Sequence, residues 1–451
     1  MNTRTSSFWL FLLGLFSATQ IRIVGSIAIA ELIIFLIAPF VFLHEYRALK
    51  HNKFMPILFW AISAMAGCGI ASWYNATPFL AALRGFATAY SVFAIPVVLH
   101  SLLRNNIMGY RWMLLGIAIS GVITIFGFYN ASELAKNTGI AADTISDLAS
   151  GEIFELVHFG AWPVLPVQGW YLATPTPYAI IAPLVITGYT LVVSASGRSA
   201  ILTSLLASVL ILLGGKTRRR LAGVQKNIIY IILISVVVLG ALSSLYKYAG
   251  KAGLLNEKAQ QKYDHQMKNV SAGKGFAPLR MIMAGRLDFF VGLYECLQSP
   301  VIGYGPWAID TDGIHEDFLR KYGDSEDYDN YVNRQLFLAN AYQVRSYALI
   351  GGHSHILQFW LSYGLLGLPY WLYVICLIFQ FWRRYVSFMP QFYGFLAVFS
   401  TSFMWDVLFS PFSNRMGFGL FITTLLLIRA SAMGRLQLPA YELIRAQKEN
   451  Y

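Results

Sequence analysis

Apolar runs of about 20 residues, separated by short polar segments, follow one another along most of the 451-residue chain. An α-helix needs a run of roughly this length to cross the hydrocarbon core of a bilayer. The alternating apolar and polar positions that are typical of barrel strands are absent from the sequence. We therefore predict an all-α integral membrane protein with about 12 transmembrane helices and one large extracytoplasmic loop that is partly helical.

The predicted membrane segments share high hydropathy and polar or basic flanks. They are residues 8–18, 23–43, 54–74, 79–103, 112–128, 153–173, 178–195, 200–213, 227–245, 353–382, 392–409 and 417–428. The segment at 153–173 contains Pro163 and Pro166, which are typical of a broken crossing or of a loop on the surface. We interpret it as a crossing, because the basic segments on either side of it require one.

The charges of the chain indicate which loops face the cytoplasm. Only 12% of the residues are charged, yet the net charge is +12. Short basic loops explain most of this excess, since such loops stay on the cytoplasmic side, and no nucleic-acid partner is expected. The charges divide the chain into an N-terminal helical bundle (1–246), a large periplasmic loop (247–352), and C-terminal helices with a cytoplasmic tail (353–451).

A charged hairpin tip carries the first candidate residue. Ser196-Gly197-Arg198-Ser199 lies between two apolar runs with almost no other polar residues. A charged side chain at bilayer depth costs roughly 2.5–3.5 kcal/mol on insertion scales, so it is rarely without a role. Arg198 is either an anion ligand at the outer surface or a side chain that reaches past apolar neighbours to water.

The large loop contains a helix predicted over residues 278–298 and ended by Pro300 and Gly303. Arg280 and Arg286 are six residues apart, about 240° around that helix, so at most one is expected to face a common ligand. The alternative is that both lie on its solvated side.

Two histidines stand where the loop leads back into an apolar run. His353 and His355 would diverge on a helix, so they are not expected to chelate one metal ion. Histidine titrates near neutrality, which makes His353 a candidate general base, with an interfacial histidine satisfied by water as the alternative. Cys68, Cys296 and Cys376 are scattered along the chain and predict neither a disulfide framework nor a metal site.

An acidic segment occupies residues 310–329 in the middle of the large loop. We predict a solvated surface here, with a carbohydrate- or cation-facing surface as the alternative.

Three stretches in order along the chain resemble the O-antigen ligases and O-antigen polymerases of bacterial envelopes. They are residues 194–200 around Arg198, Gly285-Arg286-Leu287 followed by Pro300 and Gly303-Tyr304-Gly305, and His353 followed by Leu357-Gln358, Gly364 and Gly367. Ser354 stands where this family often has asparagine.

The resemblance implies a glycosyltransferase at the outer face of the bacterial inner membrane that needs no cofactor and no metal. It implies transfer of a glycan from a polyprenyl (undecaprenyl) pyrophosphate to an acceptor hydroxyl. Arg198 and Arg286 are then expected to bind the donor pyrophosphate, with Arg280 and Arg84 as further candidates for the same anion. His353 is expected to deprotonate the acceptor.

The acceptor and the other partners follow from the same resemblance. The acceptor is either a lipid A core, as in a ligase, or another lipid-linked repeat unit, as in a polymerase. Membrane lipids and other polysaccharide-assembly membrane proteins are further expected partners.

Two classes other than a transferase stay open, a transporter (flippase) for polysaccharide or lipid-linked oligosaccharide and a non-catalytic scaffold. A transporter is expected to carry charged residues near the membrane midplane and two pseudo-symmetric halves. Here the charged candidates gather at one surface, and one loop dominates one half of the chain.

Overall fold

The computed structural model of the chain describes residues 3–17, 19–22, 26–51, 54–120, 154–156, 287–308, 310, 313–322, 354–382, 393–410, 412, 416 and 419–431, with single positions between 203 and 264. Almost all regular structure in this part of the chain is helical, which confirms the predicted class at that level. The predicted crossings at 178–195, 200–213 and 227–245 lie outside the described residues, apart from a few single positions.

Three described helices are long and apolar enough to cross a bilayer. They are α2 (Ile29–His51), α3 (Met55–Tyr74) and α4 (Phe79–Leu103). Shorter apolar helices cover Ile107–Ser120, Leu368–Gln380 (α17), Leu396–Phe409, which belongs to α18 (Tyr393–Phe409), and Gly419–Ser431. The helix α1 (Thr3–Leu15) has 13 residues and is about 20 Å long, less than the roughly 30 Å of a bilayer core.

The bounds of α3 and α4 follow the predicted ones closely, but α2 differs. The predicted crossings at 23–43 and 54–74 leave residues 44–53 as a short loop, whereas α2 continues as a helix to His51. Leu49 is fully buried in this extension, and the buried Glu45 carboxylate forms an ion pair with Arg104 just after α4. Packing and this ion pair keep the basic segment helical.

A small antiparallel sheet is an element that we did not predict. Its strands are β1 (Thr19–Arg22), β2 (Ser26–Ala28) and β3 (Phe154–Leu156), in the order β2-β1-β3. Ile21 lies opposite Ile27 on one side and Phe154 on the other. Strands of three or four residues are too short to produce a recognisable alternation in a sequence.

Of the predicted crossing at 153–173, only Phe154–Leu156 is described, and it is a strand rather than part of a helix. The segment predicted as one crossing over residues 353–382 is bent. It consists of α16 (His355–Tyr363), the single turn η3 (Gly364–Leu366) and α17. A straight helix would separate His355 and Trp371 by about 24 Å, whereas the centres of their rings are 5.0 Å apart. Gly364 makes the bend possible, because its φ of +62° is rarely adopted by residues with a Cβ. The prediction of one continuous helix was therefore wrong here.

Each end of α4 is joined to other elements by polar contacts. Just beyond its last residue, Asn106 donates hydrogen bonds to the Thr3 carbonyl and the Ser7 hydroxyl of α1, close in sequence to the Arg104–Glu45 pair. These contacts join the segments that the charges predict to be cytoplasmic.

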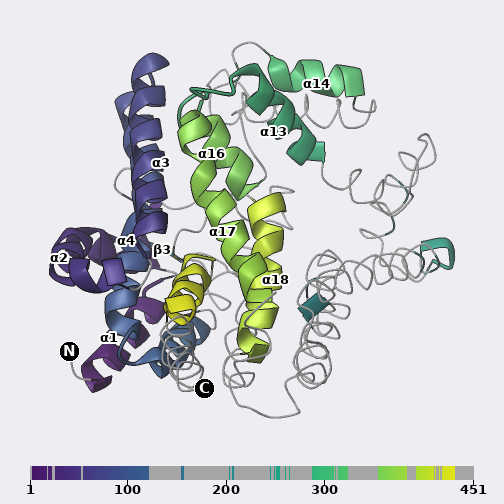
Figure 1. Cartoon of the computed structure of the whole chain (residues 1–451). Helices are drawn as coiled ribbons and strands as arrows, with labels where there is room; N and C mark the ends of the chain where they lie inside the picture. Colours follow the sequence, from purple (N-terminus) through teal and green to yellow (C-terminus); the bar gives the residue numbers. More distant parts are fainter. Residues whose placement is uncertain are drawn as a thin grey trace, which may run out of the picture.

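The first residues of α4 lie at the opposite end, about 36 Å away along the helix axis. There the turn between α3 and α4 contacts the loop that follows α13 (Leu287–Gln298). The helices α13 and α14 (Ile314–Tyr322) lie at this end of the bundle, over α16, and α1 lies near the other end (Figure 1). The contacts therefore group the predicted external segments together as well.

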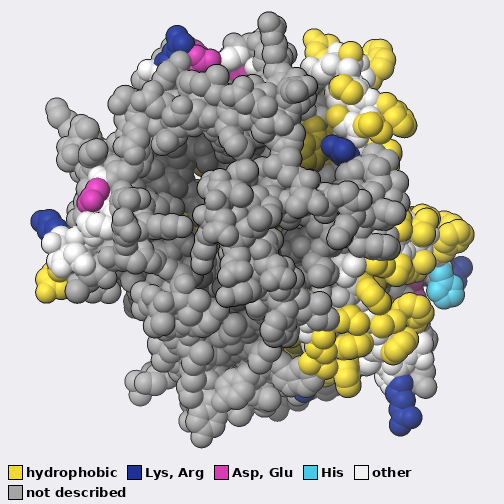
Figure 2. Space-filling model, turned by 180° about the vertical axis from the view of Figure 1, so that it is seen from behind, with side chains coloured by type: hydrophobic (Ala, Val, Ile, Leu, Met, Phe, Trp, Pro, Cys, Tyr) yellow, Lys and Arg dark blue, Asp and Glu magenta, His cyan; other side chains and the backbone are white. Residues whose placement is uncertain are grey.

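Apolar side chains dominate the outer surface of α2, α3 and α4. Phe40 is 74% exposed, Trp73 84% and Phe79 77%. Figure 2 shows that hydrophobic side chains of the described residues gather along one side of the molecule. A large apolar surface of this kind is unfavourable in water and is expected where a protein contacts lipid.

Candidate functional site

The loop at residues 299–308 is bound tightly to α16. The Tyr304 N–H donates to the Leu361 carbonyl at 2.7 Å. The indole N–H of Trp360 donates to the Pro300 carbonyl, also at 2.7 Å. Two of the three stretches that carry the family resemblance, the loop after Arg286 and the helix after His353, therefore contact each other directly.

Glycines allow the loop and α16 to touch backbone to backbone. A Cβ added at Gly303 would lie 2.5 Å from the Leu361 carbonyl oxygen, and one added at Gly364 would overlap the Val301 carbonyl. Both glycines have positive φ, +76° for Gly303 and +62° for Gly364. The spaced glycines of the motif are therefore needed for the backbone of the loop to approach the backbone of α16 this closely.

The turn between α3 and α4 and the start of α4 contact the loop at 299–308 and the end of α16. Asn75, the C-cap of α3, donates from Nδ2 to the carbonyls of Ala71 (2.8 Å) and Gly303 (3.2 Å). The hydroxyl of Tyr363 donates to the Gly85 carbonyl of α4 at 2.8 Å. Asn75 falls in the short gap between the predicted crossings at 54–74 and 79–103, and this position is the signal that could have marked it.

The helix α13 packs along α16 through its apolar face. Cys296 forms a buried cluster with Leu357 and Leu361, and its thiol lies 3.8 Å from the Leu357 carbonyl. Burial, assisted by the neighbouring Glu295 carboxylate, raises the pKa of the Cys296 thiol. The thiol therefore stays protonated and is a poor nucleophile.

The end of α13 agrees with the sequence, since the helix stops at Gln298, two residues before Pro300. Its described part begins at Leu287, directly after Arg286 in the chain. The earlier part of the predicted helix, residues 278–286, lies outside the described residues.

Ser354 is the N-cap of α16. Its hydroxyl accepts a hydrogen bond from the Leu357 N–H (3.3 Å) and donates one to the Val407 carbonyl of α18 (2.9 Å). Asparagine is as favourable as serine at an N-cap, so this departure from the family that the sequence resembles keeps the cap. His353 directly precedes this cap in the chain.

His355 has a structural role. Its ring is buried against Trp371 and Phe412, with ring centres 5.0 and 5.1 Å away. Its Nδ1 lies 2.6 Å from the Ser410 carbonyl oxygen, and because a carbonyl can only accept, Nδ1 carries a proton. The burial of the His355 ring among aromatic side chains is the reason that His353 stays our candidate base.

The first turns of α13 and α16 meet at the end of α18. The rings of Phe289 and Phe409 are 5.3 Å apart between centres. The residue after Phe409 accepts the hydrogen bond from His355. We call the meeting point of Phe289, Phe409 and His355 the helix junction.

Arg84 lies on α4, away from the helix junction. Its guanidinium carbon is 5.9 Å from the centre of the Trp307 ring, a cation–π contact. Trp307 is half-exposed and has a φ of +57°. The preceding Pro306 packs so closely against Gly85 of α4 that a Cβ added at Gly85 would overlap the proline ring. This contact is at the last turn of α16, about 12 Å along that helix from His355. Trp307 was not singled out from the sequence, although an aromatic residue directly after Gly-Tyr-Gly-Pro is a visible signal.

The described part of the acidic segment helps to build α14. The Asp310 carboxylate accepts hydrogen bonds from the N–H groups of Ile314 (2.9 Å) and His315 (2.8 Å). Glu316 forms an ion pair with Arg320 one turn later, at 2.6 Å. Carboxylates are favourable at the N-terminal end of a helix, so this part of the segment has a folding role.

Glu295 is a buried carboxylate that the sequence interpretation missed. It lies four residues after the buried Val291, hence on the same face of α13. Its Oε1 is 3.6 Å from Nδ1 of His315 on α14. The helical periodicity of α13 is the signal that could have placed it.

Four predicted site residues, Arg198, Arg280, Arg286 and His353, lie outside the described residues. Within the part of the chain that the structure describes, no group of three His, Cys, Asp or Glu side chains is placed to hold a metal ion. No family model matches the chain, and no curated protein matches it.

Proposed function

We propose that the protein is a membrane glycosyltransferase of the O-antigen ligase or polymerase type. It transfers a glycan from a polyprenyl pyrophosphate to an acceptor hydroxyl at the outer face of the bacterial inner membrane, in O-antigen or exopolysaccharide assembly. The observation that supports this most is the union of two motif stretches, the loop at 299–308 and the helix α16, through paired close contacts at Gly303 and Gly364.

Chain connectivity adds a second argument. Arg286 is three residues before Phe289, and His353 is two residues before His355. Phe289 and His355 both belong to the helix junction, so we infer that the reaction takes place beside it, where the chain enters α13 and α16.

An arginine and a histidine suit the proposed reaction. The acceptor oxygen attacks C1 of the donor sugar, and the bond between C1 and the pyrophosphate oxygen breaks. His353 takes the hydroxyl proton, and the polyprenyl pyrophosphate leaves with the electron pair. Arg286 and Arg198 stabilise the leaving group through bidentate hydrogen bonds, and attack opposite the leaving group inverts the anomeric centre.

Arg84 has a separate place in this proposal. With Trp307 it forms an exposed cation–aromatic surface at the far end of α16 from His355. This surface suits a part of the substrate that lies away from the reacting bond.

A complementation experiment tests the assignment in cells. In a strain that lacks the gene, the wild-type protein restores glycan assembly, and His353→Ala, Arg198→Ala and Arg286→Ala each fail to do so at equal membrane abundance. Matched controls are His44→Ala, at an exposed histidine of α2, and Arg320→Gln, at an exposed arginine of α14, which both restore assembly. Normal glycan with the His353→Ala protein overturns its role as the base.

The same strain separates ligase from polymerase. Loss of long chains with a single repeat unit still attached indicates a polymerase. Loss of all attached glycan, together with accumulated lipid-linked polymer, indicates a ligase.

A further inference from the structure

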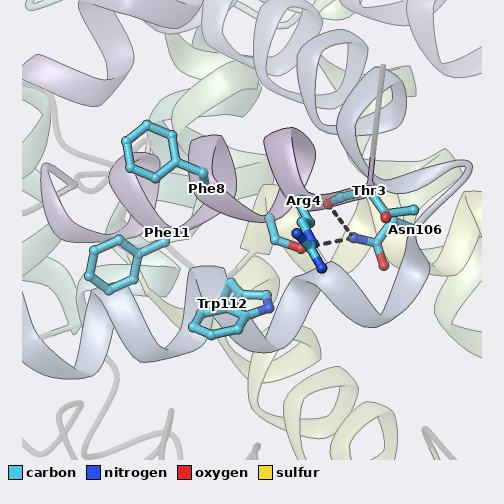
Figure 3. A pocket seen from close by; sticks show the side chains of 7 residues that line it. Thr3, Arg4, Phe8, Phe11, Asn106 and Trp112 are labelled. Carbon is cyan, nitrogen blue, oxygen red and sulfur yellow. Dashed lines mark hydrogen bonds between the residues drawn. The ribbon is translucent and has the colours of Figure 1, made fainter.

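A hollow of about 500 Å³ lies between α1 and the helix Ile107–Ser120, at the end of the bundle opposite the loop at 299–308. It is lined by Thr3, Arg4, Ser7, Phe8, Phe11, Asn106 and Trp112. Figure 3 shows two distinct ends: Arg4, Thr3 and Asn106 lie together at one, while Phe8 and Phe11 lie at the other with Trp112 between them. Its size is that of a small-molecule site.

The two helices are joined on either side of this hollow. At the polar end, Asn106 donates from Nδ2 to the Thr3 carbonyl (3.1 Å) and the Ser7 hydroxyl (2.9 Å). Deeper in, the helices touch backbone to backbone, because Cβ atoms added at Gly14 or Gly116 would overlap carbonyls of the facing helix. The hollow is therefore a fixed feature of the packing of α1.

The lining matches an amphiphile with an anionic head. An exposed arginine and the polar groups beside it suit a phosphate, and the aromatic side chains suit an acyl chain. Phe8 is 57% and Trp112 45% exposed, so the apolar end of the hollow is open at the surface of the molecule. Arg104 and Arg111, close by in the sequence, belong to a basic segment predicted to be cytoplasmic.

We propose that this hollow binds one anionic phospholipid of the cytoplasmic leaflet, with its phosphate at Arg4 and the Ser7 hydroxyl, which Asn106 holds in place, and an acyl chain along Phe8, Phe11 and Trp112. Basic pockets between membrane helices on the cytoplasmic side are known to hold such headgroups. The site is distinct from the proposed donor site, because α4 separates the two ends of the bundle by about 36 Å.

The test is a lipid titration of the purified full-length protein, delipidated in neutral detergent and followed by native mass spectrometry. We expect phosphatidylglycerol to bind at least fivefold more tightly than phosphatidylcholine, since one basic residue near a membrane surface is worth about 1 kcal/mol. Arg4→Gln removes this preference, and Arg4→Lys keeps most of it. Arg47→Gln, at an exposed arginine of α2 outside the hollow, leaves it unchanged.

Three results overturn the proposal. One is an unchanged preference for phosphatidylglycerol in Arg4→Gln. Another is an equal loss of the preference in Arg47→Gln, which indicates attraction to overall charge rather than a site. The third is binding of glycerol 3-phosphate that is as tight as that of the lipid, which indicates a site for a soluble anion.

Discussion

Replacing Gly364 by alanine tests the contact that unites the two motif stretches. The glycine has a φ of +62°, and an added Cβ would overlap the Val301 carbonyl and come within 2.5 Å of the Ile302 carbonyl carbon. These are backbone atoms, so no flexible side chain can move aside to accommodate the methyl group.

The expected loss of stability has two parts. A backbone at φ +62° and ψ −155°, a region adopted essentially by glycine alone, costs about 1–3 kcal/mol for a residue with a Cβ. Displacement of the loop also weakens two hydrogen bonds, from the Leu365 N–H to the Val301 carbonyl (2.9 Å) and from the Tyr304 N–H to the Leu361 carbonyl (2.7 Å). Each contributes about 1 kcal/mol, which brings the expected total to about 3–5 kcal/mol.

Substitutions at two other glycines distinguish the backbone cost from the cost of displacing the loop. Gly313 has a φ of +66° and nothing within 4 Å of an added Cβ, so Gly313→Ala loses only the backbone part, about 1–2 kcal/mol. Gly69 in α3 also has nothing within 4 Å and has no positive φ, so Gly69→Ala is neutral or slightly stabilising.

The assay is equilibrium unfolding of the three variants in the same mixed micelles, with proteolysis of the large loop as a local measurement. We expect Gly364→Ala to lose about 2 kcal/mol more than Gly313→Ala and to expose the loop to protease. Equal losses in the two variants would refute the close contact between the loop and α16.

Three further predictions address single side chains. Ser354→Ala is expected to lower the free energy of unfolding by about 1–2 kcal/mol, because α16 loses its N-cap, while Ser354→Asn loses less than half of that in the same unfolding assay. Trp307→Ala is expected to raise KM for the donor more than it lowers kcat, and Trp307→Phe to restore most of the difference, because the ring beside Arg84 is kept; an equal fall in kcat for both variants contradicts this. The raised pKa of Cys296 means that its thiol is protonated at pH 8. Maleimide should therefore label this thiol slowly in the folded protein, faster at higher pH, and at once after unfolding. Rapid labelling of Cys296 at pH 7 argues against the burial of α13 on α16.

The sequence predicted best what depends on neighbouring residues. The ends of α3 and α4 follow from the lengths of two apolar runs and from the turn that begins at Asn75. The end of α13 follows from Pro300, which cannot continue a helix. Gly303 and Gly364 were recognised in the sequence as parts of a motif. Their role, which is to let the loop at 299–308 touch α16 backbone to backbone, was not predictable from either glycine alone.

What the sequence did not predict depends on contacts between distant residues. The helix α2 extends because Glu45 pairs with Arg104, 59 positions later. The strand β1 pairs not only with its neighbour β2 but also with residues 154–156, far away in the sequence. The bend after Tyr363 requires a loop some 60 residues earlier in the chain, and Glu295 is buried because α14 folds over it. No local pattern contains this information.

The most direct test of the central claim uses the purified protein in lipid nanodiscs with a glycan-bearing polyprenyl pyrophosphate and a hydroxyl acceptor. The wild-type protein is predicted to release one polyprenyl pyrophosphate for each glycan transferred, and His353→Ala to do so about 10²–10⁴ times more slowly, with His44→Ala unchanged. Release at the wild-type rate by a folded His353→Ala protein would contradict the role of this histidine, and the absence of any transfer by the wild-type protein would contradict the proposed function itself.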